Sequence, residues 1–220
     1  MSDLRRIRVL LVDDDPIVCA GLELMLSSAD DVQVVGRADD GDQALEAIRT
    51  HRPDVVLMDV RMQRQDGVTT TGQIKRLDNP PRVVVLTTFD ADDVVVRAIT
   101  AGADGFLLKT SSPTQILDAV RGVDGGQATL SPATVRAVFA HVASSDDPQR
   151  TAARTAVTRL TDREREVSVA VARGLSNAQI ARELYASEAT VKTHLASAQH
   201  KLGVTNRVSV AVVVTKAGLV

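Results

Sequence analysis

The chain has almost no cysteine: Cys19 is the only one among 220 residues. An internal disulfide is therefore excluded, and a reducing cytosolic environment is expected. Long apolar runs are also missing, and none approaches the roughly 20 residues that span a bilayer. The opening "MSDLRRIRVLLVDDD" lacks the layout of a signal peptide, because acidic residues follow its apolar run at once. We therefore expect a cytoplasmic protein with no membrane association.

Charge is unevenly distributed along the chain, although the net charge is only −2. Residues 1–124 carry 14 Lys and Arg against 21 Asp and Glu, whereas residues 125–220 carry 12 against 7. An acidic half followed by a basic half indicates two domains with different partners. The basic half is a candidate for binding nucleic acid.

Short apolar runs alternate with helical patterns in the acidic half. This alternation predicts an α/β domain with a five-stranded, parallel, doubly wound sheet. We expect the flavodoxin-like strand order 2-1-3-4-5. The expected strands are 7–12, 32–36, 54–58, 82–87 and 105–108, and the expected helices are 16–28, 41–51, 67–77, 91–101 and 113–123.

Polar residues follow four of these five runs at their carboxyl ends. In the order 2-1-3-4-5 those four strands are neighbours, so their ends meet at one edge of the sheet, where such folds bind ligands. The third strand is almost wholly apolar until it reaches Asp59, a charge that is costly there without compensation. The polar residues at these ends are Asp13, Asp14, Asp15, Asp59, Thr87, Thr88 and Lys109.

Clustered carboxylates repel one another, so they take up protons or bind a cation. Oxygen ligands without His or Cys select a hard divalent ion such as Mg²⁺. With a lysine and a hydroxyl nearby, the site suits a phosphoryl group, and Asp59 is placed to be its nucleophile. The simpler alternative is that Asp13 or Asp15, taken singly, caps the following helix.

Four segments resemble the receiver domain of bacterial two-component response regulators. They are "VLLVDDDP", "VVLMDVRMQRQDG", "VVVLTTFD" and "GADGFLLKT". The resemblance implies that Asp59 is the phosphoacceptor and that a sensor histidine kinase supplies the phosphoryl group. One departure is Gln63, where the family usually has proline, so the loop after Asp59 is expected to be looser. Another is "TTTG", which opens the third helix with weak helix formers.

The same resemblance assigns roles to the other site residues. It implies that Asp13 and Asp14 hold Mg²⁺ (or Mn²⁺), Asp14 more directly, with Asp59 and the backbone carbonyl of Arg61 as further ligands. It also implies that Thr87 hydrogen-bonds the phosphoryl group, that Lys109 pairs with it, and that Phe106 is an aromatic switch.

Residues 125–157 are expected to connect two domains. A short helix is predicted over 131–143, capped by Ser131 with Pro132 at its first position. The following stretch "SSDDPQRTAARTA" is polar and is expected to be mobile.

The last 60 or so residues, from about 158, show only helical periodicity until the C-terminal valines. Thr161 and Glu164 form the pattern of a capping box, and Ser176 and Ser187 are caps of two further helices. The last two expected helices are 188–202 and 206–218. Two short helices joined by a tight turn indicate a helix-turn-helix.

This segment resembles the LuxR-type DNA-binding domain of the NarL/FixJ group, through "LTDRE", "ARGLSNAQIA", "SEATVKTH" and "KLGV". The resemblance makes 188–202 the recognition helix in an all-α, four-helix domain over 158–220. It implies that Lys192, Thr193 and Ala196 face bases, and that Thr190 and Lys201 contact phosphates of duplex DNA. It also implies a homodimer on activation, with the final helix as the usual dimer surface.

Two other functions are alternatives to a phosphorylation-controlled transcription regulator, and each requires residues that can be looked for in the sequence. A phosphotransferase of the haloacid-dehalogenase type places a second acid two residues after its nucleophile, where this chain has Arg61. A flavin or nucleotide carrier needs a phosphate-binding loop after the first strand, where this chain has the repelling "DDDP". We therefore predict a regulator, not an enzyme.

Overall fold

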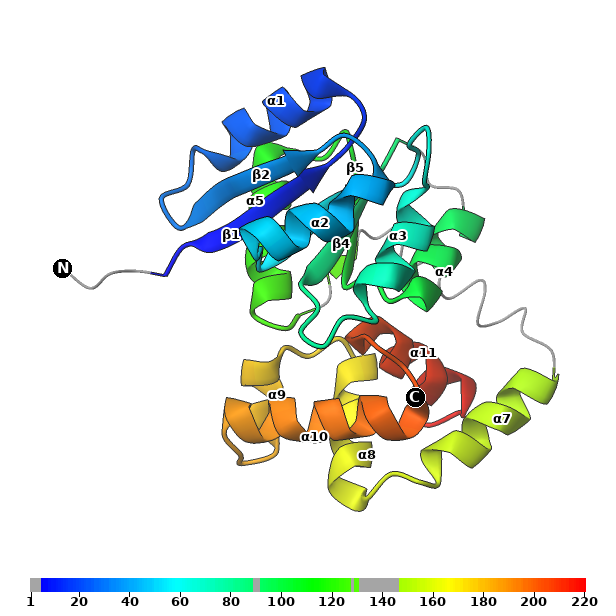
Figure 1. Ribbon diagram of the computed structural model, residues 1–220. Helices are drawn as coiled ribbons and strands as arrows, with labels where there is room; N and C mark the ends of the chain where they lie inside the picture. Colours follow the sequence, from blue (N-terminus) through cyan, green and yellow to red (C-terminus); the bar gives the residue numbers. More distant parts are fainter. Residues whose placement is uncertain (1–4, 89–91, 128, 131–146) are drawn as a thin grey trace. The chain divides into compact units, whose positions relative to one another are not determined.

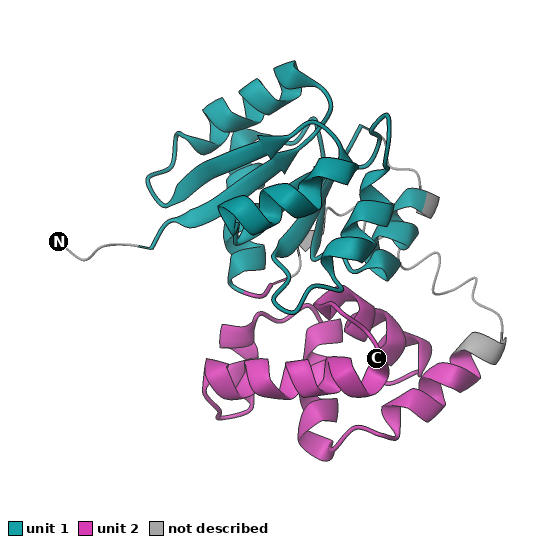
Figure 2. Cartoon of the chain, viewed as in Figure 1, with its two compact units in different colours: residues 1–125, 129–131 teal, residues 126–128, 132–220 magenta. Residues whose placement is uncertain are grey.

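A computed structural model describes residues 5–88, 92–127, 129–130 and 147–220 (Figure 1). The chain divides into two compact units (Figure 2), one of residues 1–125 with 129–131 and one of residues 126–128 with 132–220.

Unit 1 is built on a parallel sheet in the order β2-β1-β3-β4-β5-β6. The five expected strands and their order are confirmed. A short sixth strand, β6, extends the sheet beyond β5 and was not expected. The strands are β1 (Ile7–Val12), β2 (Val32–Ala38), β3 (Val55–Asp59), β4 (Arg82–Thr87), β5 (Gly105–Leu108) and β6 (Thr129–Leu130).

Helices cover both faces of this sheet (Figure 1). On one face, α1 and α5 bury apolar side chains against alternate residues of β1, β3 and β4, such as Val9, Leu57 and Val84. The other face is covered by α2, α3 and α4. Because both faces are buried, β3 has no exposed residue, which explains its nearly unbroken apolar sequence. The helices are α1 (Pro16–Leu26), α2 (Gly41–His51), α3 (Gly67–Ile74), α4 (Asp92–Ala101) and α5 (Pro113–Asp124).

Helix α3 forms despite its weak helix formers, but it ends at Ile74 instead of the expected residue 77. Asp66 caps its first turn by accepting hydrogen bonds from the amides of Val68 and Thr69, both at 3.0 Å. Thr70 and Thr71 are fully buried, and each hydroxyl donates to a main-chain carbonyl one turn earlier. Tertiary burial therefore compensates for low helix propensity at this position.

Unit 2 is helical throughout its described part. Side-chain caps begin three of its helices as expected: Thr161 with Glu164 and Ser176 with Gln179 form capping boxes, and Ser187 accepts from the amide of Thr190. The helices are α7 (Asp147–Val157), α8 (Asp162–Ala172), α9 (Asn177–Glu183), α10 (Glu188–Leu202) and α11 (Arg207–Lys216).

Helix α7 differs from the mobile linker expected at this point. Its residues Ala153 and Val157 are buried in a cluster with Leu160, Ala198 and Ala217. The two side chains are four residues apart and therefore lie on one face of the helix. The helix was not predicted because only these two apolar residues, among mostly polar ones, mark its buried face. The helix expected over 131–143 lies outside the described residues.

Candidate functional site

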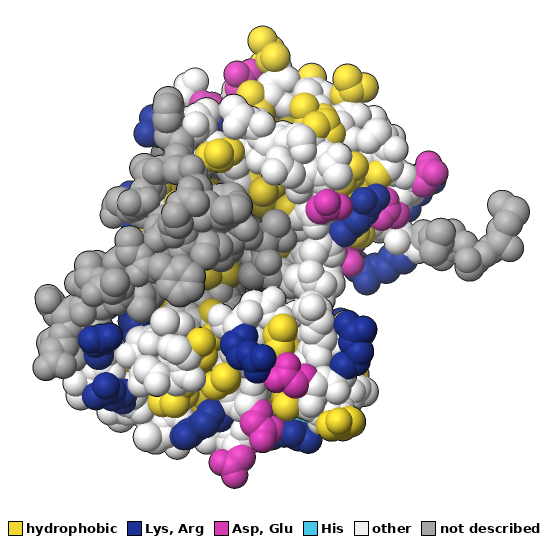
Figure 3. All heavy atoms as spheres, turned by 180° about the vertical axis from the view of Figure 1, so that it is seen from behind, with side chains coloured by type: hydrophobic (Ala, Val, Ile, Leu, Met, Phe, Trp, Pro, Cys, Tyr) yellow, Lys and Arg dark blue, Asp and Glu magenta, His cyan; other side chains and the backbone are white. Residues whose placement is uncertain are grey.

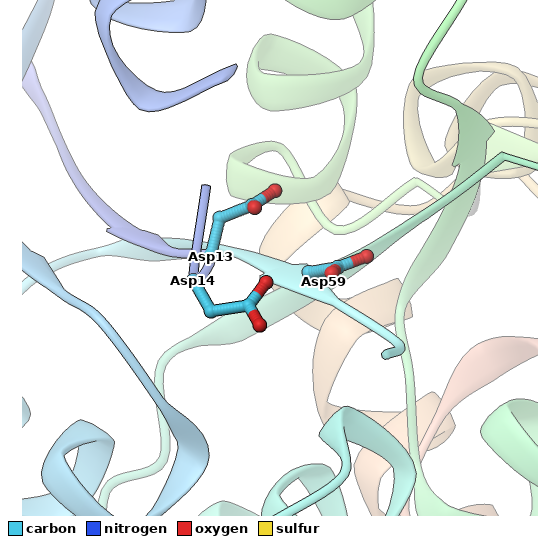
Figure 4. A group of neighbouring side chains, drawn as sticks. All are labelled: Asp13, Asp14 and Asp59. Carbon is cyan, nitrogen blue, oxygen red and sulfur yellow. The ribbon is translucent and has the colours of Figure 1, made fainter. Parts of the chain in front are cut away.

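Three carboxylates converge at the carboxyl edge of the sheet of unit 1. Figure 4 shows Asp13 and Asp14, directly after β1, pointing toward Asp59 at the end of β3. Ligand oxygens of the three lie within 4.8 Å of one another. Asp13 and Asp59 are buried, and Asp14 is half-buried. The parallel pairing of β1 with β3 brings these residues together, although 45 positions separate Asp14 from Asp59 in the sequence.

Lys109 lies between two of these acids. Its ammonium nitrogen is 2.6 Å from Oδ2 of Asp13 and 3.1 Å from Oδ1 of Asp59. The main chain fixes its position, because the amide of Lys109 donates to the carbonyl of Thr87 on β4 at 2.7 Å. Burial by itself lowers the pKa of Lys109, but the two carboxylates outweigh it and raise the pKa above its ordinary value. The lysine is therefore held as a cation.

Asp59 has an unfavourable environment for a negative charge. Burial raises the pKa of its carboxyl, and the charge of Asp13 adds to this effect. The cation of Lys109 and the amide of Arg61, which donates a hydrogen bond to Asp59, act in the opposite direction without cancelling the rise. The protein's own groups therefore compensate the negative charge of Asp59 only in part.

The donor set fits a hard divalent cation. Three carboxylates and one ammonium leave two negative charges uncompensated within the cluster. All the side-chain donors are oxygens, which Mg²⁺ and Mn²⁺ accept and softer metals do not prefer. The half-buried Asp14 gives the cluster a side open to solvent, as Mg²⁺ requires when it keeps part of its water shell.

The other residues expected at the site are Thr87, Phe106 and Arg61. Thr87 ends β4 and is buried. Phe106 lies on β5, with 1% of its surface exposed, and pairs in register with Val85. Arg61 follows β3, and its main chain lies beside Asp59 through the amide hydrogen bond described above. The structure thus brings Asp13, Asp14, Asp59, Thr87 and Lys109 to one edge of the sheet, whereas Phe106 is the second residue of β5 and lies before that edge.

The expected recognition helix is α10, and most of its candidate residues are exposed. Thr190, Lys192, Thr193 and Ala196 all face solvent, whereas Val191, Leu195 and Ala198 are buried. Within the described part of the chain, Lys192 makes no ion pair or hydrogen bond. The hydroxyl of Thr190 shares a hydrogen bond of 2.8 Å with Ser187, and that of Thr193 donates to the carbonyl of Ala189.

Lys201 differs from the other candidates, because its ammonium group is engaged inside unit 2. It lies 2.8 and 2.7 Å from the two carboxylate oxygens of Glu164, a buried residue of α8. Ser197 also donates to Glu164, at 2.6 Å. Burial by itself raises the pKa of Glu164, but the hydrogen bonds from Lys201, Ser197 and Thr161 outweigh it and hold the pKa at about 2. A phosphate contact by Lys201 would compete with this ion pair.

On one face of unit 2, the basic side chains of the described residues form no continuous patch. In Figure 3, in the lower part of the view, Lys and Arg side chains are spread across the face, with acidic side chains among those near its centre. The basic excess of the second half of the sequence is thus spread out on this face. Net charge on this face therefore does not identify the DNA-contacting surface that the sequence predicts.

Two buried acids play parts that the sequence interpretation did not assign. Glu164 was expected only to complete a capping box, and its contacts with Ser197 and Lys201 come from residues more than 30 positions away. Asp40 was not singled out at all, although its carboxylate binds the loop after β3. Its position directly before a helix was a signal, but one that ordinarily indicates an N-cap.

Known families match both units. The receiver family, described as "Response regulator receiver domain", matches residues 9–121, and "Bacterial regulatory proteins, luxR family" matches residues 158–214. The chain belongs to the response regulators. It is a two-component response regulator with a receiver domain and a LuxR-type DNA-binding domain, and its relatives are named as transcriptional and response regulators.

Curated relatives align with this response regulator over nearly their full length. It is 37% identical to "Transcriptional regulatory protein LiaR" of Bacillus subtilis, over 94% of this chain and 95% of that protein. It is 34% identical to "Nitrate/nitrite response regulator protein NarL" of Escherichia coli, over 96% of each. Both names describe regulators, in agreement with the family matches.

A solved structure matches the whole response regulator as well. The response regulator ChrA of a heme-sensing two-component system is 38% identical, with a TM-score of 0.54, over 99% of this chain and all of that chain.

Receiver domains of this family generally bind Mg²⁺ through an acidic pocket, and a cluster of this kind is present here. No helix among the described residues is long and apolar enough to cross a membrane.

Proposed function

We propose that Asp59 accepts a phosphoryl group from a phosphohistidine of a sensor histidine kinase. A carboxylate oxygen of Asp59 attacks the phosphorus, the new O–P bond forms as the P–N bond breaks, and the imidazole leaves with a proton from solvent. Among the three acids, only Asp59 lies at the end of β3, where its carboxylate faces both Asp13 and Asp14. That position, with the ammonium nitrogen of Lys109 3.1 Å away, is the observation that carries the proposal.

The residues that would hold the metal are Asp13, Asp14, Asp59 and the backbone carbonyl of Arg61. Bound there, Mg²⁺ or Mn²⁺ would neutralise charge on the incoming phosphoryl oxygens. Lys109 would support the same charge, because its ammonium nitrogen reaches both Asp13 and Asp59. Phosphorylation would give the ammonium group of Lys109 a new anionic partner, the phosphoryl group on Asp59.

The conformational response is proposed to involve Thr87 and Phe106. The hydroxyl of Thr87, at the end of β4, would hydrogen-bond the phosphoryl group. Phe106, on the adjacent strand β5, would follow that movement, since Val85 and Phe106 pair in register. The two strands then bias the face formed by α4, β5 and α5 between two arrangements.

The output is proposed to be regulated binding of promoter DNA. Lys192, Thr193 and Ala196 on the exposed side of α10 would meet base edges in the major groove, with Thr190 and Lys201 at phosphates. Activation would form a homodimer that protects two dyad-related half-sites about one helical turn apart. A regulator that binds chromosomal DNA and receives phosphoryl groups inside the cell would be cytoplasmic.

The proposed domain limits are 1–124 for the receiver, 125–157 for the linker and 158–220 for the DNA-binding domain. The family matches to residues 9–121 and 158–214 support them. The burial of Ala153 and Val157 against Leu160 indicates that the end of the linker folds with the DNA-binding domain.

Phosphorylation with labelled acetyl phosphate tests this proposal directly. We expect Asp59→Asn, or chelation of Mg²⁺, to abolish labelling of the full chain. Asp39→Asn is the matched control, because it removes an exposed acid that follows β2 at the same edge of the sheet. Undiminished labelling of Asp59→Asn would reject the assignment of the phosphoacceptor.

A further inference from the structure

The loop between β3 and α3, residues 60–66, joins the proposed phosphoacceptor to the helix that follows. It carries Arg61, whose carbonyl is the proposed main-chain ligand of the metal. A main-chain ligand can serve a metal only if the loop holds its peptide group in place. With Gln63 in the loop in place of a proline, other contacts must restrict its conformation.

Asp40 supplies such contacts from the end of β2. Its Oδ2 accepts a hydrogen bond from the amide of Arg64 and its Oδ1 accepts one from the amide of Gln65, both at 2.9 Å. One carboxylate therefore binds two successive peptide groups of the loop. Hydrogen bonds to a charged acceptor are stronger than neutral ones, and two of them define an orientation as well as a position.

An ordinary capping role does not explain Asp40. It occupies the N-cap position of α2, but its side chain makes no capping hydrogen bond to that helix. The carboxylate is 2% exposed, so its charge must be compensated by the groups that it contacts. Burial by itself raises its pKa, but the amides of Arg64, Gln65 and Gly41, together with the charge of Arg64, outweigh that effect and lower the pKa below its ordinary value.

The surroundings of Asp40 leave little room for another loop conformation. A Cβ atom on Gly41 would overlap the hydroxyl of Thr70 and lie 2.6 Å from the carbonyl oxygen of Gln65. A Cβ on Gly67 would overlap the carbonyl oxygen of Asp59. Both glycines permit a close approach of backbone segments around the loop. The side chain of Gln65 closes the contact by donating to Thr70 Oγ1 at 2.8 Å.

From these contacts we infer that Asp40 is a positioning residue for the metal site: it holds the β3–α3 loop so that the carbonyl of Arg61 is ready to bind the cation. Asp40 is not part of the group formed by Asp13, Asp14 and Asp59, and it acts through the loop and not by contact with the metal. The inference rests on the proposed function, since it assumes that the acidic cluster binds Mg²⁺ or Mn²⁺.

Asp42→Asn provides a matched control for Asp40→Ala and Asp40→Asn. Asp42 is an exposed acid on the same helix and pairs with the guanidinium of Arg64 at 3.0 Å. Its replacement removes the same charge near the same loop and leaves both loop amides bonded to Asp40. Asp40 also lies 3.6 Å from Nε of Arg64, so an effect confined to the Asp40 variants comes from its own contacts with Arg64 and Gln65 and not from the exposed charge of Asp42.

Two measurements on the full chain test the inference. Hydrogen exchange without metal should be at least ten-fold faster at the amides of Arg64 and Gln65 in Asp40→Ala, while amides of β1 and β4 keep their protection. Titration with Mn²⁺, followed by the electron paramagnetic resonance of the free ion, should show affinity about 10- to 100-fold weaker than that of the parent chain. At saturating metal, phosphorylation by acetyl phosphate should return to the parent rate.

The possible failures are distinct. Faster exchange with unchanged Mn²⁺ affinity would overturn the inference, and so would unchanged exchange of the loop amides. Equal loss of protection in the loop and the core strands would show that Asp40 supports the whole domain, which also overturns it. If the parent chain itself fails to bind Mn²⁺, or binds it equally after Asp14→Asn, the proposed function fails instead.

Discussion

The ammonium nitrogen of Lys201 lies 2.7 Å from Oε2 of Glu164, which ties the last turn of α10 to the first turn of α8. Glu164 has 6% of its side chain exposed and Lys201 has 34%. The pair gives Lys201 a structural role within unit 2, in addition to the phosphate contact expected from the sequence. The two roles predict different effects of mutation.

Lys201→Met should lower the free energy of unfolding of unit 2 by roughly 1–3 kcal/mol, because it leaves the buried Glu164 without its cation. Urea denaturation followed by circular dichroism measures this loss. Lys192→Met is the control, since Lys192 is exposed and unpaired within the described residues and its replacement should leave stability unchanged. If Lys201→Met keeps full stability and only weakens DNA binding, Lys201 acts at phosphates and not as a support.

The stability of unit 2 should fall in acid, and Glu164 should account for a measurable part of the loss. The pKa of Glu164 is lowered from 4.5 to about 2 in the folded state. A lowered pKa stabilises the fold above pH 4.5, and this contribution disappears as the pH falls toward 2. Relative to Glu164→Gln, the parent chain should lose on the order of 2–3 kcal/mol of unfolding free energy over this window. Parallel pH profiles for the two chains would contradict the assignment.

A DNA-binding fragment should include α7. We expect residues 147–220 to be more stable than residues 158–220 by roughly 1–3 kcal/mol, because the longer fragment buries Ala153 and Val157. Chemical denaturation of the two fragments compares them directly. Arg154→Ala in the longer fragment changes an exposed residue of the same helix and should have little effect. Equal stability of the two fragments would show that α7 does not contribute to folding.

Lys192→Ala should weaken binding of duplex DNA by roughly 1–3 kcal/mol if Lys192 reads a base, and the preference at that base pair should relax. If Lys192 contacts a phosphate, the loss should be uniform across sequences and the salt dependence should fall by about one counterion. Binding titrations at several salt concentrations distinguish the two cases. An unchanged affinity and salt dependence would mean that α10 does not enter the groove at this residue.

Local sequence signals identified most helix starts in unit 2 and all five main strands of unit 1. The caps Thr161, Ser176 and Ser187 act within four residues of their partners, so they can be recognised in a linear pattern. Helix α7 was missed for the opposite reason. Its two buried residues are small or medium-sized and stand among polar ones, and only their partners on α10 and α11 reveal that they are core.

The site residues also divide into those that the sequence predicted and those that only the structure revealed. By itself, the sequence predicted a parallel sheet, from the alternation of apolar strands with helical patterns, and the polar strand ends at Asp13, Asp59 and Lys109. In the order 2-1-3-4-5 such a sheet gathers these ends at one edge. Only the tertiary structure decided that Asp40 binds the loop after β3 and that Glu164 binds Lys201. These contacts join residues 24 to 37 positions apart. Side-chain hydrogen bonds at such separations leave no periodic pattern in a sequence, since they depend on how packed elements approach one another and not on local conformation.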